Sequence, residues 1–453
     1  QPSEAALAFQ TLMADYIRDF PNGAIRMVQV DTDDILGSLT RELDEAPDTS
    51  EFDEKVHKGE LPRALAAELH HREYATVVAS LARNGPTFAA PSSESGRTAV
   101  REAAPGIVIL DVTAASTLAI LPTAIRTSLM GFFGGIQTTL AQRADAHEAA
   151  LAAARDSGLT IVQPRAGQPA GISSTPDSEL AARRQLADEL ENVLRATEEI
   201  SHTAGIGIPE LQDSDWRRPG FDALGLAVAT RSPLWADDAP LGQVALAAGV
   251  SSISTADVIE EAASIGAIST DERSVAIAAL ISHGYVRFPF ESSSWDMALQ
   301  MEGVPQGLLR AARFASPDAV TDRVEWLFKL ADTRWQNAHE LRDIVGVMAE
   351  WVEEIAGTEE QTSTTIHKIC RLLLGRNWLS SSTLPWCLMG LHNDRLRVDA
   401  VSSMLHEIFR AYEHLAAETE PRLAAGFIFE LVSQLEAADA SRVRSAILRD
   451  RFE

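Results

Sequence analysis

Aspartates follow two separate apolar segments of this chain. Asp111 comes directly after residues 107–110, and Asp237 and Asp238 come directly after residues 234–236. Apolar runs of this kind are typical of buried parallel strands, whose C-terminal ends open into a cleft. Carboxylates that converge from separate strand ends repel one another unless a cation joins them, so these residues predict Mg²⁺ or Mn²⁺ chemistry.

A further acid, Asp222, stands at the head of an apolar segment with helical spacing, residues 222–230. Each acid also has a purely structural interpretation. Asp222 fits the first turn of a helix, where the helix dipole favours a negative charge. Asp111 could cap the following helix through the amide of Thr113 or Ala114, and aspartates such as Asp237 are common in turns. The combination of these positions favours a shared site.

Trp216, Arg217 and Arg218 precede Asp222 in a loop. An aromatic ring beside two guanidinium groups could stack on a nucleic-acid base and hold a phosphate. The alternative is a surface loop whose arginines form ordinary ion pairs.

The segments around these residues alternate between strand and helix patterns. Strands are expected at residues 107–111, 136–140, 159–162, 233–236 and 251–254, and helices at residues 114–133, 143–156, 176–203 and from 222 onward. Such alternation predicts an α/β fold with a central parallel sheet flanked by helices. The strand signal disappears beyond about residue 290, where apolar residues recur every three or four positions over 320–330, 338–355, 364–374, 398–415 and 421–435.

The chain is therefore expected to have three parts. Residues 1–104 form an N-terminal α-rich segment, residues 105–290 the α/β domain, and residues 291–453 a helical C-terminal domain. A length of 453 residues fits two or three domains.

Composition limits the function classes. The net charge of −26 excludes a globally basic nucleic-acid-binding surface, so a nucleic-acid substrate would need a local basic patch. No run approaches the roughly 18 to 20 apolar residues that cross a bilayer, so a membrane protein is not expected. Two cysteines are too few for a disulfide scaffold and favour a reducing compartment, so we expect a cytoplasmic protein.

Residues 106–290 resemble the PIN-domain nucleases. That family has an apolar strand ending in Asp and followed by a small hydroxyl residue, here Asp111 and Thr113. It also has a helix beginning Asp-Ala-Leu, here at Asp222, and a following strand that ends in acids, here Asp237 and Asp238. Residues 249–255 are similar to the family's closing strand, with Thr255 as its hydroxyl residue.

The resemblance implies that Asp111, Asp222 and Asp238 hold one or two Mg²⁺ or Mn²⁺ ions and that Asp237 assists them. The family usually has one more acid on an intervening helix, and both Asp145 and Glu148 qualify here. Thr113 and Thr255 would then contact the substrate. Family members mostly cut RNA.

The hypothesis from sequence is a metal-dependent endoribonuclease, acting on RNA or on single-stranded DNA. Its helical C-terminal domain would regulate it by binding a protein partner or a second copy of the chain, as in a toxin or a defence system. The alternative is a catalytically inactive PIN-like interaction or scaffold protein, which the acidic charge favours. A phosphohydrolase acting on small phosphate esters is a third hypothesis.

Overall fold

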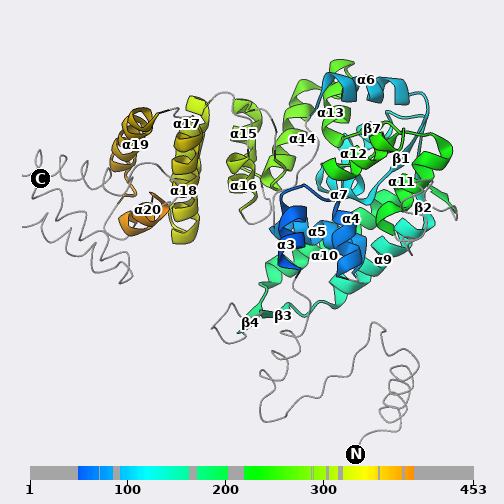
Figure 1. The fold of residues 1–453 in the computed structure, drawn as a ribbon, viewed down its shortest axis with the longest axis horizontal. Coiled ribbons are helices and arrows are strands. Elements are labelled where there is room, and N and C mark those ends of the chain that lie inside the picture. Colours follow the sequence, from blue (N-terminus) through cyan, green and yellow to red (C-terminus); the bar gives the residue numbers. More distant parts are fainter. Residues whose placement is uncertain are drawn as a thin grey trace, which may run out of the picture. The chain divides into compact units, whose positions relative to one another are not determined.

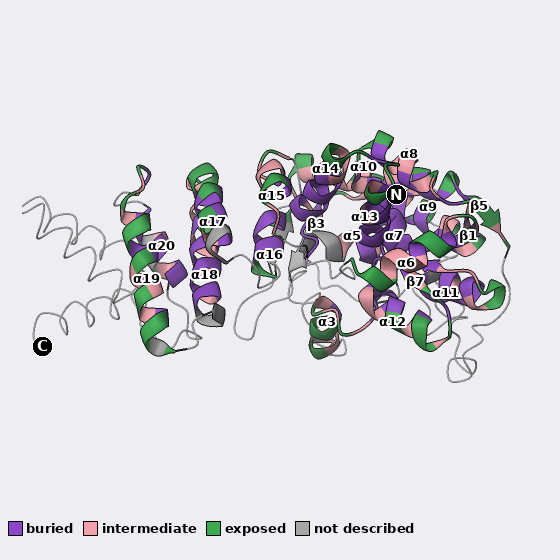
Figure 2. Ribbon diagram, turned by 90° about the horizontal axis from the view of Figure 1, so that it is seen from above, coloured by how far each residue is buried: buried purple, intermediate pink, exposed green. Residues whose placement is uncertain are grey.

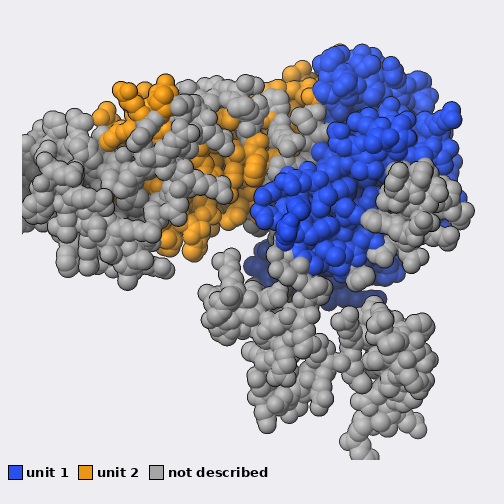
Figure 3. Space-filling model, in the orientation of Figure 1, with its two compact units in different colours: residues 1–81, 93–120, 130–258 blue, residues 82–92, 121–129, 259–453 orange. Residues whose placement is uncertain are grey.

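The computed structural model describes residues 49–391, except residues 71, 85–91, 163–170, 202–218, 287, 289, 302–305, 315–319, 356–357 and 380–382 (Figure 1). The chain divides into two compact units (Figure 3). Unit 1 comprises residues 1–81, 93–120 and 130–258, and unit 2 comprises residues 82–92, 121–129 and 259–453. The three-part division expected from the sequence remains a prediction.

A parallel sheet of five strands forms the centre of unit 1 within the described residues. Its strands, in spatial order, are β5 (Glu198–Ile200), β2 (Gly135–Thr139), β1 (Ile107–Leu110), β6 (Leu234–Trp235) and β7 (Ser252–Ile253). Every neighbouring pair is parallel. The α/β class with a central parallel sheet, predicted from the alternating pattern, is confirmed.

The order in which the chain adds strands to the sheet reverses at β1. The chain passes from β1 outward through β2 to β5, and then returns to place β6 and β7 on the other side of β1. In register, Leu110 of β1 lies opposite Trp235 of β6. In open parallel sheets, ligands bind outside the carboxyl ends of strands at such a reversal. Asp111, Asp237 and Asp238 follow these two strands directly.

Buried apolar side chains explain why these short segments form the sheet. Val108, Ile109 and Leu110 are fully buried, as are Leu234 and Trp235. β-branched and aromatic residues pack well on a pleated surface, and strands covered on both faces are apolar throughout. The ring of Trp235 also packs at 5.2 Å from that of Phe133.

Helices surround the sheet of unit 1. They are α3 (Ser50–His57), α4 (Arg63–Leu69), α5 (Tyr74–Asn84), α6 (Glu94–Ala103), α7 (Val112–Ile120), α9 (Leu140–Arg155), α10 (Asp177–Arg195), α11 (Pro219–Thr230), α12 (Ala239–Ala247) and α13 (Thr255–Ser264), of which α5 and α13 also extend into unit 2. α8 (Thr123–Met130) belongs to unit 2 except for its last residue. α11 packs on β1 and β2, α9 packs on β2, α6 and α12 pack against β7, and α7 packs against α10. α7 is buried over nearly its whole length (Figure 2).

Three sequence predictions need correction. The helix expected at residues 114–133 is divided into α7 and α8, because Pro122 between them cannot continue a helix. The helix expected at residues 176–203 ends at Arg195, and the chain goes on to form β5. The strand expected at residues 159–162, β3 (Leu159–Val162), lies outside the parallel sheet, because it pairs antiparallel with β4 (Gly171–Ser174).

Unit 2 is helical in its described part, as the apolar spacing predicts. After the second half of α13 it contains α14 (Thr270–Ser282), α15 (Ser292–Ala298), α16 (Gly307–Arg313), α17 (Val320–Arg334), α18 (Ala338–Ile355), α19 (Glu359–Leu374) and α20 (Leu384–Leu391). Trp295 and Trp326 join α15 to α17, with the indole Nε1 of Trp326 donating to the carbonyl oxygen of Trp295 at 3.0 Å. The predicted helices at residues 398–415 and 421–435 lie outside the described residues. Across the described helices, none is both long and apolar enough to cross a bilayer.

Candidate active site

Asp111 occupies two positions at once, the end of β1 and the residue before the first turn of α7. Its Oδ2 accepts a hydrogen bond from the backbone N–H of Thr113 at 2.8 Å, which is the usual interaction of an N-cap aspartate. The capping interpretation made from sequence therefore describes one oxygen of this carboxylate. The other oxygen, Oδ1, is buried and has no hydrogen-bond partner.

The hydroxyl of Thr113 connects the ends of β1 and β6. It donates to Oδ2 of Asp111 at 2.5 Å and accepts from the backbone N–H of Asp237 at 3.0 Å. A buried hydroxyl with one donated and one accepted bond is held in a single orientation. Thr113 therefore fixes the two strand ends relative to each other. Its hydroxyl was predicted to contact the substrate, but in this structure it binds the Asp111 carboxylate and the Asp237 backbone.

Asp237 lies against the first turn of α13. Its Oδ1 accepts the backbone N–H of Thr255 at 2.7 Å, and the Thr255 hydroxyl accepts from the indole Nε1 of Trp235 at 3.0 Å. Its Oδ2 is buried and has no hydrogen bond of good geometry. The nearby hydroxyl of Thr117, which donates to the carbonyl oxygen of Thr113 at 3.0 Å, nevertheless lowers the pKa of the Asp237 carboxyl against the larger effect of burial. Asp237 thus resembles Asp111, with one oxygen bound to a helix N-terminus and the other without a partner.

Asp238 precedes α12 and contacts the N-terminal helices of unit 1. Its Oδ2 accepts the backbone N–H of Arg63, the first residue of α4, at 2.7 Å. The Arg63 side chain is itself 6% exposed, and its positive charge opposes the effect of burial on the pKa of Asp238. No signal in the sequence identifies Arg63, because it reaches Asp238 through its backbone N–H rather than through its side chain.

Burial dominates the electrostatics of these acids. Asp111, Asp237 and Asp238 are all at most 3% exposed. Burial raises the pKa of Asp111 to about 7, and the nearby negative charge of Asp238 adds to the rise, while the two bonds from Thr113 oppose it. Burial also raises the pKa of Asp237 and of Asp238. The N-termini of α7, α12 and α13 offset part of this cost, because helix N-termini stabilise negative charge.

Tyr74, at the start of α5, contacts the carboxylate of Asp111. Its hydroxyl donates to Oδ2 of Asp111 at 3.3 Å. The ring is 1% exposed, and burial followed by the charges of Asp111 and Asp238 raises the pKa of this phenol well above its ordinary value. Tyr74 is therefore neutral and acts as a donor to the carboxylate.

The two acids predicted on the intervening helix lie in different environments on α9. Asp145 is 8% exposed, and its two oxygens accept the backbone N–H groups of Tyr74 and Ala75 at 2.9 and 2.8 Å. Burial raises its pKa to about 6. Glu148 is exposed. Asp145 therefore binds the first turn of α5, and each of its oxygens already has one donor.

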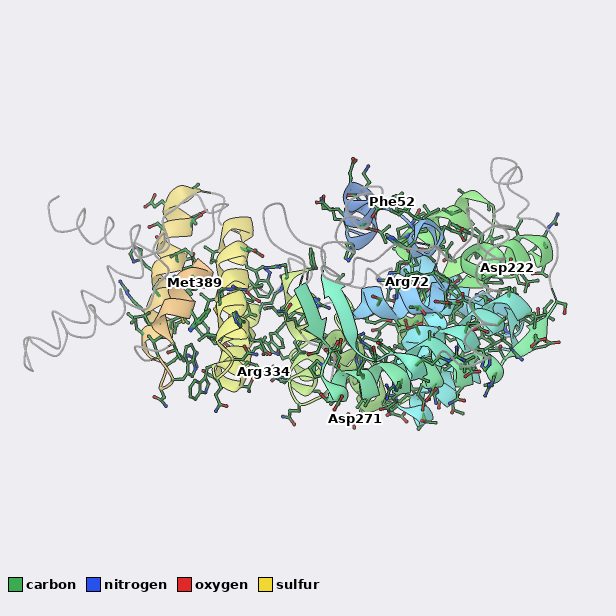
Figure 4. The ribbon with its side chains drawn as sticks, turned by 90° about the horizontal axis from the view of Figure 1, so that it is seen from below. Phe52, Arg72, Asp222, Asp271, Arg334 and Met389 are labelled. Carbon is green, nitrogen blue, oxygen red and sulfur yellow. The ribbon has the colours of Figure 1, made fainter. Side chains whose placement is uncertain are left out.

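Of the remaining predicted residues, the structure describes Asp222 but not the three residues of the loop before it. Asp222 is half-buried on the first turn of α11 (Figure 4). Two residues before it, Gly220 packs so closely on α4 that an added Cβ would lie 2.6 Å from the Cβ of Ala64. Trp216, Arg217 and Arg218 lie outside the described residues.

Asp257, an acid that sequence reasoning missed, lies beside Asp237 and adds to the rise in the pKa of that carboxyl. Its Oδ2 accepts both the N–H and the hydroxyl of Ser254 at 3.1 and 2.7 Å, and its Oδ1 accepts the N–H of Ser93 at 3.0 Å. The Asp257 N–H in turn donates to the Ser254 hydroxyl at 3.2 Å. The spacing Ser-x-x-Asp resembles a capping box and is the signal that could have identified it.

The two unpartnered oxygens are the feature of this site that fits a divalent cation. Mg²⁺ and Mn²⁺ prefer carboxylate oxygens, and Asp111 Oδ1 and Asp237 Oδ2 are buried acceptors without donors. The arrangement is not a complete coordination sphere, since no group of three or more Asp, Glu, His or Cys side chains among the described residues is placed to hold a metal ion. Any further ligand must come from a rearranged side chain, from substrate or from water.

Residues 109–247 match the family model described as the PIN domain associated with the TPR-GreAB-C-PIN system. This match covers the central part of the chain and confirms the resemblance drawn from the strand-end acids. Neither the curated proteins nor the solved structures contain a match to this chain.

Proposed function

Since the central region of this chain is a PIN domain, we propose that it is a metal-dependent nuclease that hydrolyses the phosphodiester bonds of RNA. The observation that carries the proposal is the pair of buried, unpartnered oxygens, Asp111 Oδ1 and Asp237 Oδ2, at the carboxyl ends of adjacent parallel strands. Buried acceptors are nearly always satisfied in folded proteins, so two unsatisfied ones beside the strand reversal favour a ligand that supplies positive charge.

Asp111 and Asp237 would hold Mg²⁺ or Mn²⁺, with Asp238 beside them. When bound, such a cation polarises a phosphodiester and lowers the pKa of a water molecule. Thr113 keeps the two acids in place, because its hydroxyl bonds the Asp111 carboxylate and the Asp237 backbone. The backbone N–H groups of Thr113 and Thr255 each bind one oxygen of Asp111 and of Asp237, respectively. The second oxygen of each acid therefore remains for the ion.

Asp222 and one acid of α9 complete the proposed ligand set when the site is loaded. Either Asp145 or Glu148 could be that acid: in the described state both oxygens of Asp145 bind the start of α5, whereas Glu148 is exposed. Substrate contact by Trp216, Arg217 and Arg218 is part of the proposal, with single-stranded DNA as the other polymer to test. A regulatory role for the helical C-terminal part, through a protein partner or a second copy, is proposed on its size alone.

The second candidate function is a PIN-like interaction protein without catalysis. It is favoured by one observation, the near-complete burial of Asp111, Asp237 and Asp238. A buried acid contributes to packing and capping whether or not it ever meets a cation.

The experiment that separates these functions is RNA cleavage with Mg²⁺ or Mn²⁺ by the native chain and by Asp111→Asn and Asp238→Asn. Asp188→Asn, at an exposed position of α10, is the matched control. The nuclease proposal expects metal-dependent cleavage by the native and control chains and its loss in the two site variants. Cleavage that survives in both site variants would refute the assigned site.

A further inference from the structure

The N-terminal helices of unit 1 lie directly on the acids at the strand ends. The backbone N–H of Arg63 binds Asp238 at 2.7 Å, and the hydroxyl of Tyr74 binds Asp111 at 3.3 Å. The N–H groups of Tyr74 and Ala75 bind Asp145 on α9. Three acids from three elements are thus contacted by one short stretch of chain, residues 62–70 and 72–75, which we call the cap.

The cap closes the acids off from solvent. Arg63 is 6% exposed and Tyr74 is 1% exposed, while Asp111 and Asp238 beneath them are 0% and 3% exposed. A phosphodiester of a polymer cannot reach carboxylates buried to this degree. The charge of Arg63 also lowers the pKa of Asp238 against the larger effect of burial, so the cap supplies some of the positive charge that a cation would supply.

We propose that the cap is an autoinhibitory element, which in its closed position keeps both a divalent cation and an RNA phosphate out of the acidic site, so that the native chain cleaves only through the small fraction of molecules in which the cap is displaced. The inference rests on the proposed function, since it assigns a closed state to the same site. Displacement removes one donor from Asp111, one from Asp238 and both from Asp145, so the same movement exposes the acids and leaves their oxygens able to bind a cation.

The attachment of the cap offers a place to loosen it without touching any acid. α4 rests on the first turn of α11 through small residues, where Ala64 is 0% exposed and lies against Gly220. A Cβ added at Gly220 would already come within 2.6 Å of the Ala64 Cβ, so this contact has no room for a larger side chain. Overpacking such a contact forces the packed elements apart.

The test compares the full-length native chain with Ala64→Gln and with Ala152→Gln, the same substitution at an exposed position of α9. Glutamine is chosen because it enlarges residue 64 without adding a carboxylate that could itself bind metal. Mn²⁺ binding is measured by electron paramagnetic resonance, and cleavage of RNA in Mn²⁺ is measured in parallel. A protein whose competent state is rarely populated shows weakened apparent affinity, so we expect Ala64→Gln to bind Mn²⁺ at least tenfold more tightly than the other two chains.

The two readouts distinguish failure of the cap from failure of the nuclease. Tighter Mn²⁺ binding with faster cleavage supports both proposals. Tighter binding with no cleavage supports the cap and overturns the nuclease. Equal Mn²⁺ binding in all three folded chains, including no binding in any of them, overturns the cap.

A milder variant covers the case in which Ala64→Gln does not fold by circular dichroism. Tyr74→Phe removes only the hydroxyl that donates to Asp111 and retains the buried ring. Loss of one such bond changes an equilibrium by roughly two- to tenfold, so Mn²⁺ affinity should rise by that factor. An affinity that is unchanged or weaker in Tyr74→Phe overturns the cap, because Tyr74 would then be neutral to the site or part of it.

Discussion

The hydroxyl of Thr113 accepts a hydrogen bond from the backbone N–H of Asp237 at 3.0 Å, which joins the end of β6 to the start of α7. The same hydroxyl donates to Asp111. One buried side chain therefore positions both acids that we assign to the cation.

Replacing Thr113 by valine should weaken the protein at this junction. Valine has nearly the shape of threonine but leaves the buried N–H of Asp237 without an acceptor and removes a donor from Asp111. An unsatisfied buried group costs about 1–3 kcal/mol, so the free energy of unfolding in urea should fall by that amount. Thr113→Ser keeps the hydroxyl and is the control. Equal stability of the valine and serine variants would contradict the role given to the hydroxyl.

Asp111 should make stability depend on pH in the metal-free protein. Burial raises its pKa to about 7, whereas an aspartate in an unfolded chain has a pKa of about 3.9. The native state binds the proton more tightly between these values, so the free energy of unfolding falls as pH rises from about 4 to about 7. Asp111→Asn has no proton to lose there, and its neutral amide can keep the oxygen that accepts from Thr113.

We therefore expect Asp111→Asn to be more stable than the native chain at pH 8, by on the order of 4 kcal/mol. The advantage should shrink toward pH 5. Urea unfolding in a chelator at both pH values measures it. A difference between the two proteins that does not change with pH would contradict the assigned pKa.

Gly96 in α6 should resist substitution because of Asp257. A Cβ at Gly96 would lie 2.3 Å from Asp257 Oδ1, and three hydrogen bonds from Ser93 and Ser254 hold that carboxylate in place. Alanine in a helix is normally more favourable than glycine by about 1 kcal/mol, but here we expect Gly96→Ala to lower the melting temperature. Gly106→Ala, whose Cβ would meet nothing closer than 3.4 Å, is the comparison. A raised melting temperature for Gly96→Ala would show that Asp257 moves aside freely.

The two acids of α9 should behave differently when neutralised. Asparagine at position 145 keeps only one acceptor for the two N–H groups at the start of α5, so Asp145→Asn should lose about 1–3 kcal/mol of stability. Glu148→Gln, at an exposed position, should stay within about 0.5 kcal/mol of the native value. If instead Asp145→Asn is as stable as native, its carboxylate does not hold α5.

Sequence patterns predicted the sheet and the acids at its edge because both depend on local signals. An apolar run followed by Asp is visible in residues 107–111, and strand ends of a parallel sheet meet at one edge whatever the details of the helices. The helix predicted over residues 338–355 matches α18, since its apolar spacing is regular. β5 was missed because its three residues, Glu198–Ile200, carry no apolar alternation.

The contacts between the N-terminal helices and the acids could not be predicted from local sequence patterns. Arg63 and Tyr74 reach Asp238 and Asp111 across 175 and 37 residues of chain, and Arg63 does so through a backbone N–H that every residue but proline has. No residue type or spacing in the sequence indicates that α4 and α5 cover this edge. The closed state of the site therefore comes from tertiary packing alone.

The most direct test of the account is Mn²⁺-dependent RNA cleavage by the full-length chain carrying Ala64→Gln, compared with the same chain that also carries Asp111→Asn. The account predicts cleavage by the first protein that requires the metal and a loss of at least 10²-fold in the second, as expected when a charge-stabilising catalytic group is removed. Equal cleavage by the two proteins, or intact RNA in the presence of a first protein that has bound Mn²⁺, would contradict it.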